Sequence, residues 1–205
     1  MLILVASIGA IGGFLAALVP VVAKRIERKA ARKRTQKTIS MEVGNFNELR
    51  ETVDVLFEST RVDRFLILVG FNGRDYVKYA SATYEQHVRR TDTAASIGAV
   101  SRYRRIEVDD HYRSILKQSE TDGLVQMTTA NMPDSLLKGY YEMEGVKHSA
   151  LFHVHRVVDF WGPERDLILY CSMATHGAEP FDQTELTHMS LLVQHLKEFF
   201  KNTAG

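Results

Sequence analysis

The sequence predicts an α+β domain behind a single N-terminal transmembrane helix. The domain is expected to hold an antiparallel sheet, with its N- and C-terminal helices on one face. Three observations carry this prediction: an uncharged run opens the chain, two pairs of apolar runs are each joined by a turn signal, and amphipathic repeats open and close the domain. Strands joined by short turns pair antiparallel, and terminal helices can cover one face of such a sheet. We assign residues 1–23 to the transmembrane helix, 24–40 to a polybasic linker and 41–203 to the domain.

The first element is the uncharged run Leu2–Ala23. As a helix it would be about 33 Å long, enough to cross a hydrocarbon core of about 30 Å. A cleaved signal peptide is the alternative, but it would have basic residues before a shorter apolar run. Here the basic residues follow the run, and the positive-inside rule places them in the cytoplasm. We therefore expect a single-pass protein of the inner or plasma membrane, with its N-terminus outside and its domain cytoplasmic.

The linker holds eight of the 26 Lys and Arg residues, against Glu27 as its one acid. Basic side chains beside a transmembrane helix attract anionic lipid, each contributing about 1 kcal/mol near the surface. The rest of the chain has 18 basic and 24 acidic residues, which argues against nucleic acid as a partner. The single cysteine excludes an internal disulfide. The residues expected at the membrane surface are Lys24, Arg25, Arg28, Lys29, Arg32, Lys33 and Arg34.

The domain reads as helix, hairpin, mixed middle, hairpin, helix. Apolar residues at spacings of three and four predict a first helix from Val43 to near Thr60. Strands are expected at 64–71 and 76–84 around Asn72–Gly73, and at 149–158 and 166–175 around a Trp-Gly-Pro turn. The middle is expected to contain strands at 103–108 and 123–129 and helices at 111–119 and 135–143.

The last helix has the clearest start signal. Asp182 as N-cap and Glu185 three residues later form a capping-box pattern, and Phe181 and Leu186 occupy the positions of a hydrophobic staple. The helix is expected to run to about Lys201 and to bury one apolar stripe.

The sequence contains GVKHSALFHV from Gly145, LILYCSMATH from Leu167 and RFLILVGFNGRDYVKYASATY from Arg64, and these three stretches resemble the GAF domain family. GVKHSALFHV, from Gly145, is similar to the family's penultimate strand. LILYCSMATH with the following Pro180–Leu186 resembles its closing strand and helix, and RFLILVGFNGRDYVKYASATY resembles its first hairpin. The resemblance covers residues 41–202, most weakly between 90 and 140. It implies a six-stranded antiparallel sheet, a small-molecule pocket opposite the terminal helices, and dimers through those helices.

The chain departs from the better-defined subfamilies. It lacks the N-K-x-x-F…D-E pattern of the cyclic-nucleotide-binding members and the several cysteines of the methionine-sulfoxide reductases. Cys171 lies in a predicted strand, whereas bilin-binding members attach their chromophore in a helical region. The resemblance is therefore to a generic, divergent member, and the cofactor is unknown.

His153 and His155 lie two apart on a predicted strand, so they are expected to share one face, opposite Ala150, Phe152, Val154 and Val158. They could line a pocket, lie in solvent, or hold a metal or haem. The charged stretch 102–111 could bind an anion through Arg102, Arg104 or Arg105, or neutralise its own charges. The predicted ligand-pocket residues are His153, His155, Arg105, Met127 and Tyr141.

Self-association is suggested at both ends of the chain. Gly9 and Gly13 form a G-x-x-x-G motif, through which transmembrane helices approach closely. In the last helix, Leu191, Val193 and Phe200 lie off the main stripe, and a parallel homodimer would cover them; packing within the chain is the alternative. The predicted dimerisation residues are Gly9, Gly13, Met189, Leu192, Leu196, Phe199 and Phe200.

The sequence contains no Ser-His-Asp ordering, phosphate-binding glycine loop or H-E-x-x-H motif. It favours a non-enzymatic, membrane-anchored sensory module that binds a small molecule or a cytoplasmic protein partner. A dimerising adaptor with no ligand is the alternative. A small enzyme, or a metal or haem domain using His153 and His155, comes third.

Overall fold

The computed structural model describes residues 47–71, 76–88, 102–158 and 166–203. The predicted transmembrane helix, the basic linker and both glycines of the G-x-x-x-G motif lie outside these ranges. None of the helices within them is long and apolar enough to cross a membrane.

In the described part of the chain, six strands form one antiparallel sheet in the order β3-β2-β1-β6-β5-β4. The two central strands are also the most apolar, because a central strand covered on both faces has no side exposed to water. The six-stranded antiparallel sheet confirms the prediction. The strands are β1 (Arg64–Phe71), β2 (Tyr79–His87), β3 (Ile106–Glu107), β4 (Leu124–Thr128), β5 (His148–Val157) and β6 (Leu167–Thr175).

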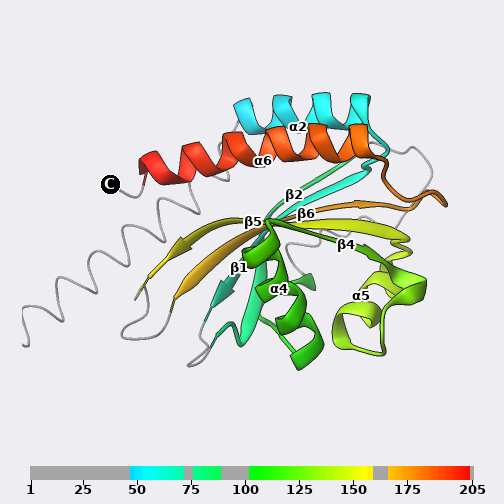
Figure 1. Ribbon diagram of the computed structural model, residues 1–205, viewed down its shortest axis with the longest axis vertical. Coiled ribbons are helices and arrows are strands. Elements are labelled where there is room, and N and C mark those ends of the chain that lie inside the picture. Colours follow the sequence, from blue (N-terminus) through cyan, green and yellow to red (C-terminus); the bar gives the residue numbers. More distant parts are fainter. Residues whose placement is uncertain (1–46, 72–75, 89–101, 159–165, 204–205) are drawn as a thin grey trace, which may run out of the picture. The chain divides into compact units, whose positions relative to one another are not determined.

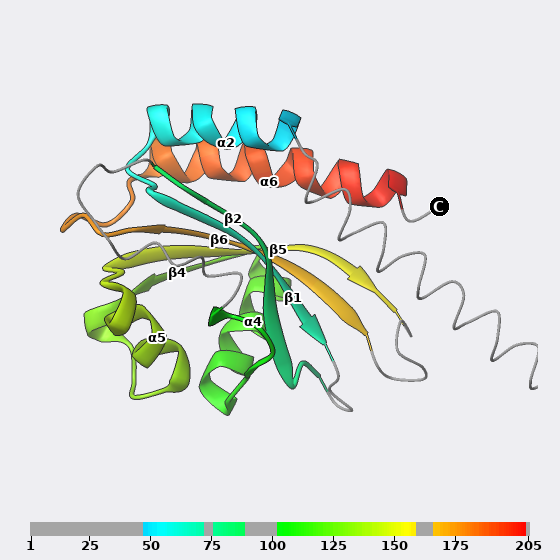
Figure 2. The ribbon, with the colours of Figure 1, turned by 180° about the vertical axis from the view of Figure 1, so that it is seen from behind.

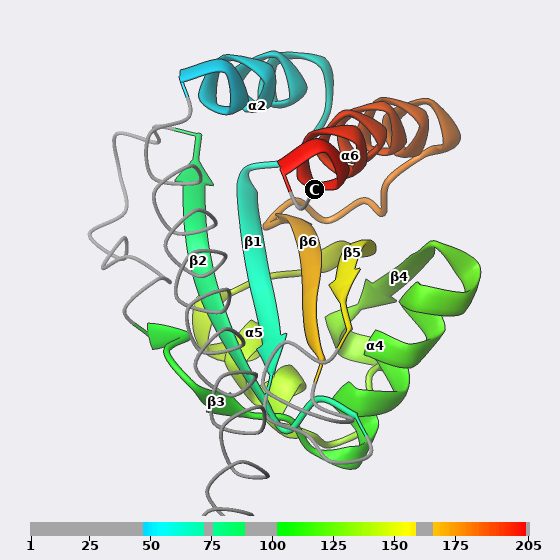
Figure 3. The same cartoon turned by 90° about the vertical axis from the view of Figure 1, so that its left-hand side faces the viewer.

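Helices cover both faces of the sheet. The first and last helices of the described chain, α2 (Asn47–Ser59) and α6 (Gln183–Thr203), lie side by side on one face (Figures 1 and 2). The opposite face carries α4 (Asp110–Asp122) and α5 (Leu136–Glu144), and a short 3-10 turn, η1 (Thr129–Asn131), follows β4 (Figure 3). The prediction that the terminal helices share one face is confirmed.

The start of α6 has the predicted capping geometry. The Asp182 carboxylate accepts a hydrogen bond from the Glu185 backbone N–H at 3.0 Å, and Glu185 Oε2 accepts one from the Asp182 N–H at 2.9 Å. Phe181 and Leu186 are both buried, as expected for the hydrophobic staple.

The middle of the domain differs from the prediction in detail. The third strand is only two residues long, because Arg105 adopts a φ of 57° and interrupts the extended backbone just before it. The helix expected at 111–119 is longer at both ends. It starts after Asp109, whose carboxylate accepts a hydrogen bond from the Tyr112 N–H at 2.7 Å, and it ends at Gly123 in the left-handed conformation.

The last helix buries more than one stripe. Val193 and Phe200 are 2% and 4% exposed within the chain itself, so the inference that a partner is needed to cover them is wrong. The physical reason is that α6 packs against the sheet and also against α2, which takes up a wider apolar face than a single contact would. Leu191 remains 59% exposed.

Gly70 in β1 lies where the sheet has no room for a side chain. A Cβ at this position would lie 2.8 and 2.9 Å from the two methyl groups of Val77 and 3.2 Å from Tyr170. Gly70→Ala should therefore lower the free energy of unfolding by about 1–3 kcal/mol, the usual cost of overpacking. Urea unfolding of the purified chain measures this loss.

Gly139 in α5 is the matched control. A Cβ there meets nothing within 4 Å. Gly139→Ala should stabilise the domain by about 0.4–1 kcal/mol through helix propensity and a less flexible unfolded chain. Equal effects of the two substitutions would contradict the close packing around Gly70.

Candidate functional site

The sheet face under α4 and α5 is lined by aliphatic side chains and an unusual number of tyrosines. Burial raises the pKa of Tyr103, Tyr112 and Tyr170 well above the usual value for a phenol. These hydroxyls therefore stay protonated and neutral, and each can donate one hydrogen bond. The tyrosines of this face are Tyr76, Tyr103, Tyr112, Tyr140, Tyr141 and Tyr170.

A buried arginine lies among these rings. Arg64 is the first residue of β1 and is 2% exposed. Leu66 and Leu68 lie two and four residues further along the strand, on the same face as Arg64, and both belong to the core under α4 and α5. The Arg64 side chain is therefore directed to the α4–α5 face. Burial opposes its charge, but Glu144 and the neighbouring tyrosines hold the pKa of Arg64 above its usual value.

Arg64 pairs with the last residue of α5. Its Nη1 donates a hydrogen bond to Glu144 Oε2, and the Tyr103 hydroxyl donates to the same oxygen at 2.6 Å. Arg102 Nη1 lies 3.8 Å from the other carboxylate oxygen. One carboxylate thus lies between two guanidinium groups, one buried and one partly exposed.

The remaining donors of Arg64 have no hydrogen-bond acceptor among the described residues. Both Nε and Nη2 are buried and unpartnered. The guanidinium carbon lies 6.0 Å from the ring centre of Tyr103 and 5.9 Å from that of Tyr141, so aromatic rings offset part of the desolvation of its charge. Rings do not replace the two missing acceptors.

A histidine links the end of α5 to the sheet. His176 Nδ1 lies 2.7 Å from Asp63 Oδ1, and its Nε2 lies 3.0 Å from the Glu144 carbonyl oxygen. Both ring nitrogens face acceptors, and only the doubly protonated ring can donate to both. The hydrogen bond to Asp63 is the main reason that the pKa of His176 is raised.

The sequence analysis did not single out Arg64 or Glu144. The available signal was an arginine at the head of the apolar run RFLILVGF, in phase with two inward leucines. Nothing in the sequence pairs it with Glu144, which lies 80 residues further along the chain.

The predicted pocket residues fall in different places. Met127 and Tyr141 lie in the core of the α4–α5 face, where the Tyr141 hydroxyl accepts a hydrogen bond from Ser149 Oγ at 3.1 Å. Arg105 is exposed at the β2–β3 edge, with its guanidinium 4.8 Å from the ring centre of Tyr79. Of the three arginines in the charged stretch, Arg102 is the one that pairs with Glu144.

The two strand histidines do not share a face. His153 pairs with Tyr170 and His155 pairs with Leu169, with an irregularity in β5 between them. Because neighbouring residues of β6 face opposite sides, this β-bulge places the histidines on opposite faces, and the shared-face prediction is wrong. No group of three or more His, Cys, Asp or Glu in the described ranges could hold a metal ion.

A second prediction for this segment, that Val158 packs under the terminal helices, is also wrong. Ala150, Phe152 and Val154 are buried as expected, but Val158 is 69% exposed and does not pack under the terminal helices. Burial lowers the pKa of both His153 and His155, which favours neutral imidazoles. Cys171 is fully buried, and burial raises its thiol pKa well above the usual value, as for a packed residue rather than a nucleophile.

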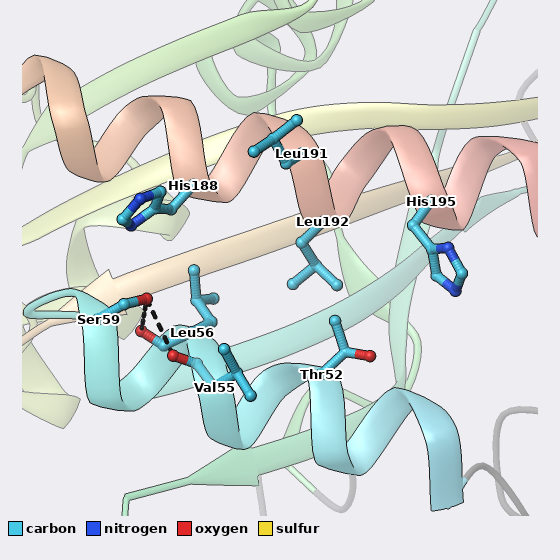
Figure 4. Close-up of a pocket in the computed structure, with 8 residues that line it drawn as sticks. All are labelled: Thr52, Val55, Leu56, Ser59, His188, Leu191, Leu192 and His195. Carbon is cyan, nitrogen blue, oxygen red and sulfur yellow. Dashed lines mark hydrogen bonds between the residues drawn. The ribbon is translucent and has the colours of Figure 1, made fainter.

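A groove lies between α2 and α6, with a volume of about 460 Å³. Leu192 of α6 and Leu56 of α2 point toward each other across it (Figure 4). The exposed side chains of Val55 and Leu191 add apolar surface to this groove. Met189 and Leu196 are buried, and the Phe199 side chain lies outside the described part. The groove residues are Thr52, Val55, Leu56, Ser59, His188, Leu191, Leu192 and His195.

No protein-family model and no curated protein match this chain. Its structure is similar to the GAF domain of a two-component sensor histidine kinase from Bacillus halodurans, with a TM-score of 0.51, 10% identity, and coverage of 78% of this chain and 95% of that chain. The GAF domain/HD domain protein from Geobacter sulfurreducens gives a TM-score of 0.50 at 13% identity, and the match covers 79% of this chain and 97% of that chain. A far-red cyanobacteriochrome photoreceptor gives a TM-score of 0.55 at 12% identity, and the match covers 87% of this chain and 97% of that chain. At such identities the likeness shows the fold alone, and it is the GAF fold that the sequence resemblance implied.

Proposed function

We propose that this chain is a membrane-anchored sensory module, which binds a small molecule on the α4–α5 face and signals by associating with a separate cytoplasmic protein. One observation carries the ligand-binding part: Arg64 is buried with two donors unpaired among the described residues. Such groups are rare in protein cores, because each unpaired donor costs about 1–3 kcal/mol. Ligand sites combine mostly apolar walls with a few convergent polar groups, as this face does.

The membrane part of the proposal rests on the uncharged run and the basic linker. In this arrangement the helix 2–23 crosses the inner or plasma membrane with its N-terminus outside, and the linker lies along anionic lipid. The cytoplasmic domain carries no catalytic role in this proposal.

We further propose a homodimer. The partner that fits the α2–α6 groove is a second copy of this chain, because a two-fold axis would set the exposed Val55 and Leu191 of one copy against the groove of the other. Gly9 and Gly13 would bring the membrane helices together in the same dimer. Tethering both chains to one membrane raises the effective concentration of the second contact.

The alternative function is a structural adaptor with no ligand. The close packing of the α4–α5 face favours it, since Leu116, Leu151 and Ile168 there are at most 1% exposed. In that case the Arg64–Glu144 pair would serve only to hold α5 against the sheet. A metal or haem domain using both strand histidines has no support, because they lie on opposite faces.

One experiment separates these functions. The full chain, expressed and fractionated, should sediment with membranes, and native mass spectrometry after detergent extraction should show a dimer that retains a small molecule. Denaturation should release that molecule. A chain that stays in the supernatant would overturn the anchor. A membrane chain whose mass matches the bare polypeptide under every extraction condition would favour the adaptor.

A further inference from the structure

The two unpaired donors of Arg64 are neighbours on the guanidinium group. Nη1 is taken by Glu144, whereas Nε and Nη2 have no acceptor in the described part of the chain. In a guanidinium, the Nε–H and the adjacent Nη2–H point in the same direction and form a fork of two parallel donors. The unpaired groups therefore form one complete bidentate site.

The fork is part of a buried cation. Arg64 shares the Glu144 carboxylate with Arg102, and the Tyr103 hydroxyl donates a hydrogen bond to the same carboxylate. A group that accepts hydrogen bonds from the fork is therefore held more strongly when it is negatively charged.

The surroundings select the kind of anion. Two parallel N–H donors match the two oxygens of a carboxylate in one plane. The rings of Tyr103 and Tyr141 flank the guanidinium, and Leu66 and Ala174 lie beside Arg64 in the same core. Apolar surroundings of this kind suit a carboxylate that carries an apolar body better than a strongly hydrated phosphate or sulfate.

We infer that the Nε–Nη2 fork of Arg64 binds the carboxylate of a small organic acid whose apolar part packs against the tyrosines of the α4–α5 face. This inference rests on the proposed function and names the ligand's chemical class. Glu144 holds the opposite side of the guanidinium and so orients the fork.

The test follows the Arg64 side chain directly. The full chain in detergent micelles, with ¹⁵N-labelled arginine, is titrated with acetate, propionate and benzoate at constant ionic strength. The Arg64 Nε–H resonance should shift saturably, and the melting temperature should rise over the same concentration range. Benzoate and propionate should act at lower concentrations than acetate. Sodium chloride and phosphate serve as comparison anions and should leave this resonance unmoved.

Three substitutions sharpen the test. Arg64→Lys keeps the charge but removes the fork, and should weaken carboxylate binding about tenfold or more. Glu144→Gln keeps an acceptor for Nη1 but removes the competing negative charge, and should tighten binding. Arg156→Lys is the matched control, because Arg156 pairs with Glu120 and Asp166 outside this cluster, and carboxylate binding should not change.

Several results would overturn the inference. Equal responses to chloride, phosphate and carboxylate would mean that the fork has no carboxylate preference, and no saturable response would mean that it is only hydrated. Unchanged carboxylate affinity in a folded Arg64→Lys chain would also overturn it. If Arg64→Lys does not fold, the inference is tested by the shift of the Arg64 Nε–H resonance in wild type and by the tighter carboxylate binding expected of Glu144→Gln. A co-purifying molecule that binds independently of Arg64 would end this inference but leave the sensory function in place.

Discussion

Glu144→Ala should destabilise the domain by about 3–5 kcal/mol, because it leaves the Arg64 guanidinium buried without its counter-ion. The side chains of Arg64 and Glu144 are 2% and 8% exposed, so water cannot replace the lost carboxylate. The Tyr103 hydroxyl would lose its acceptor at the same time. Chemical or thermal unfolding of wild-type and variant chains measures the difference.

Glu142→Ala is the matched control for this prediction. Glu142 belongs to the same helix and is exposed, and its carboxylate lies 4.0 Å from Lys138 Nζ. Its replacement should change stability by no more than about 0.5 kcal/mol. Replacing both members of the buried pair, as in Arg64→Met with Glu144→Leu, should cost less than Glu144→Ala alone, because no isolated charge remains. Similar losses for Glu142→Ala and Glu144→Ala would show that the buried pair does not stabilise the domain.

Glu185→Gln should remove about 2–3 kcal/mol of stability at neutral pH, in the range of hydrogen bonds to charged groups. The Glu185 carboxylate accepts hydrogen bonds from the Arg61 backbone N–H at 2.7 Å, from Arg61 Nε at 3.0 Å and from the Asp182 N–H at 2.9 Å. The Arg61 guanidinium is 41% exposed, so solvent screens part of the ion pair, and the two backbone donors add to the loss.

The effect should depend on pH in a defined direction. The hydrogen bond from Arg61, ahead of the other causes, lowers the pKa of Glu185 from its ordinary 4.5 to about 2. A carboxyl group with a lower pKa in the folded state contributes its full stability above pH 4.5 and loses it as the pH falls toward 2. The stability difference between wild type and Glu185→Gln should therefore be constant from about pH 5 to 8. Below about pH 5 this difference should become smaller.

Unfolding curves at a series of pH values test this dependence. Glu198→Gln, on the exposed side of the same helix, is the control and should show little difference from wild type at any pH. A Glu185→Gln difference that persists undiminished at pH 2 would contradict the ionised, hydrogen-bonded state of this carboxylate.

Much of the fold could be predicted because its signals are local. The capping box at Asp182 and Glu185 involves residues three apart, and the near-continuous apolar runs of β1 and β6 are typical of central strands that are covered on both faces. These features depend on the backbone within a few residues. The sequence by itself therefore determined the order of elements, the antiparallel sheet and the placement of both terminal helices on one face.

The tertiary structure decided what depends on register and on distant contacts. One extra residue in β5 changes which face of the sheet His155 lies on relative to His153. No local sequence pattern predicts this β-bulge. The wide buried face of α6 follows from its packing against both α2 and the sheet. Arg64 pairs with Glu144 only because the fold brings the end of α5 next to the start of β1. The two residues are 80 positions apart in the chain. Long-range contacts of this kind arise from the packing of the whole domain, and for that reason the candidate site became visible only in the folded chain.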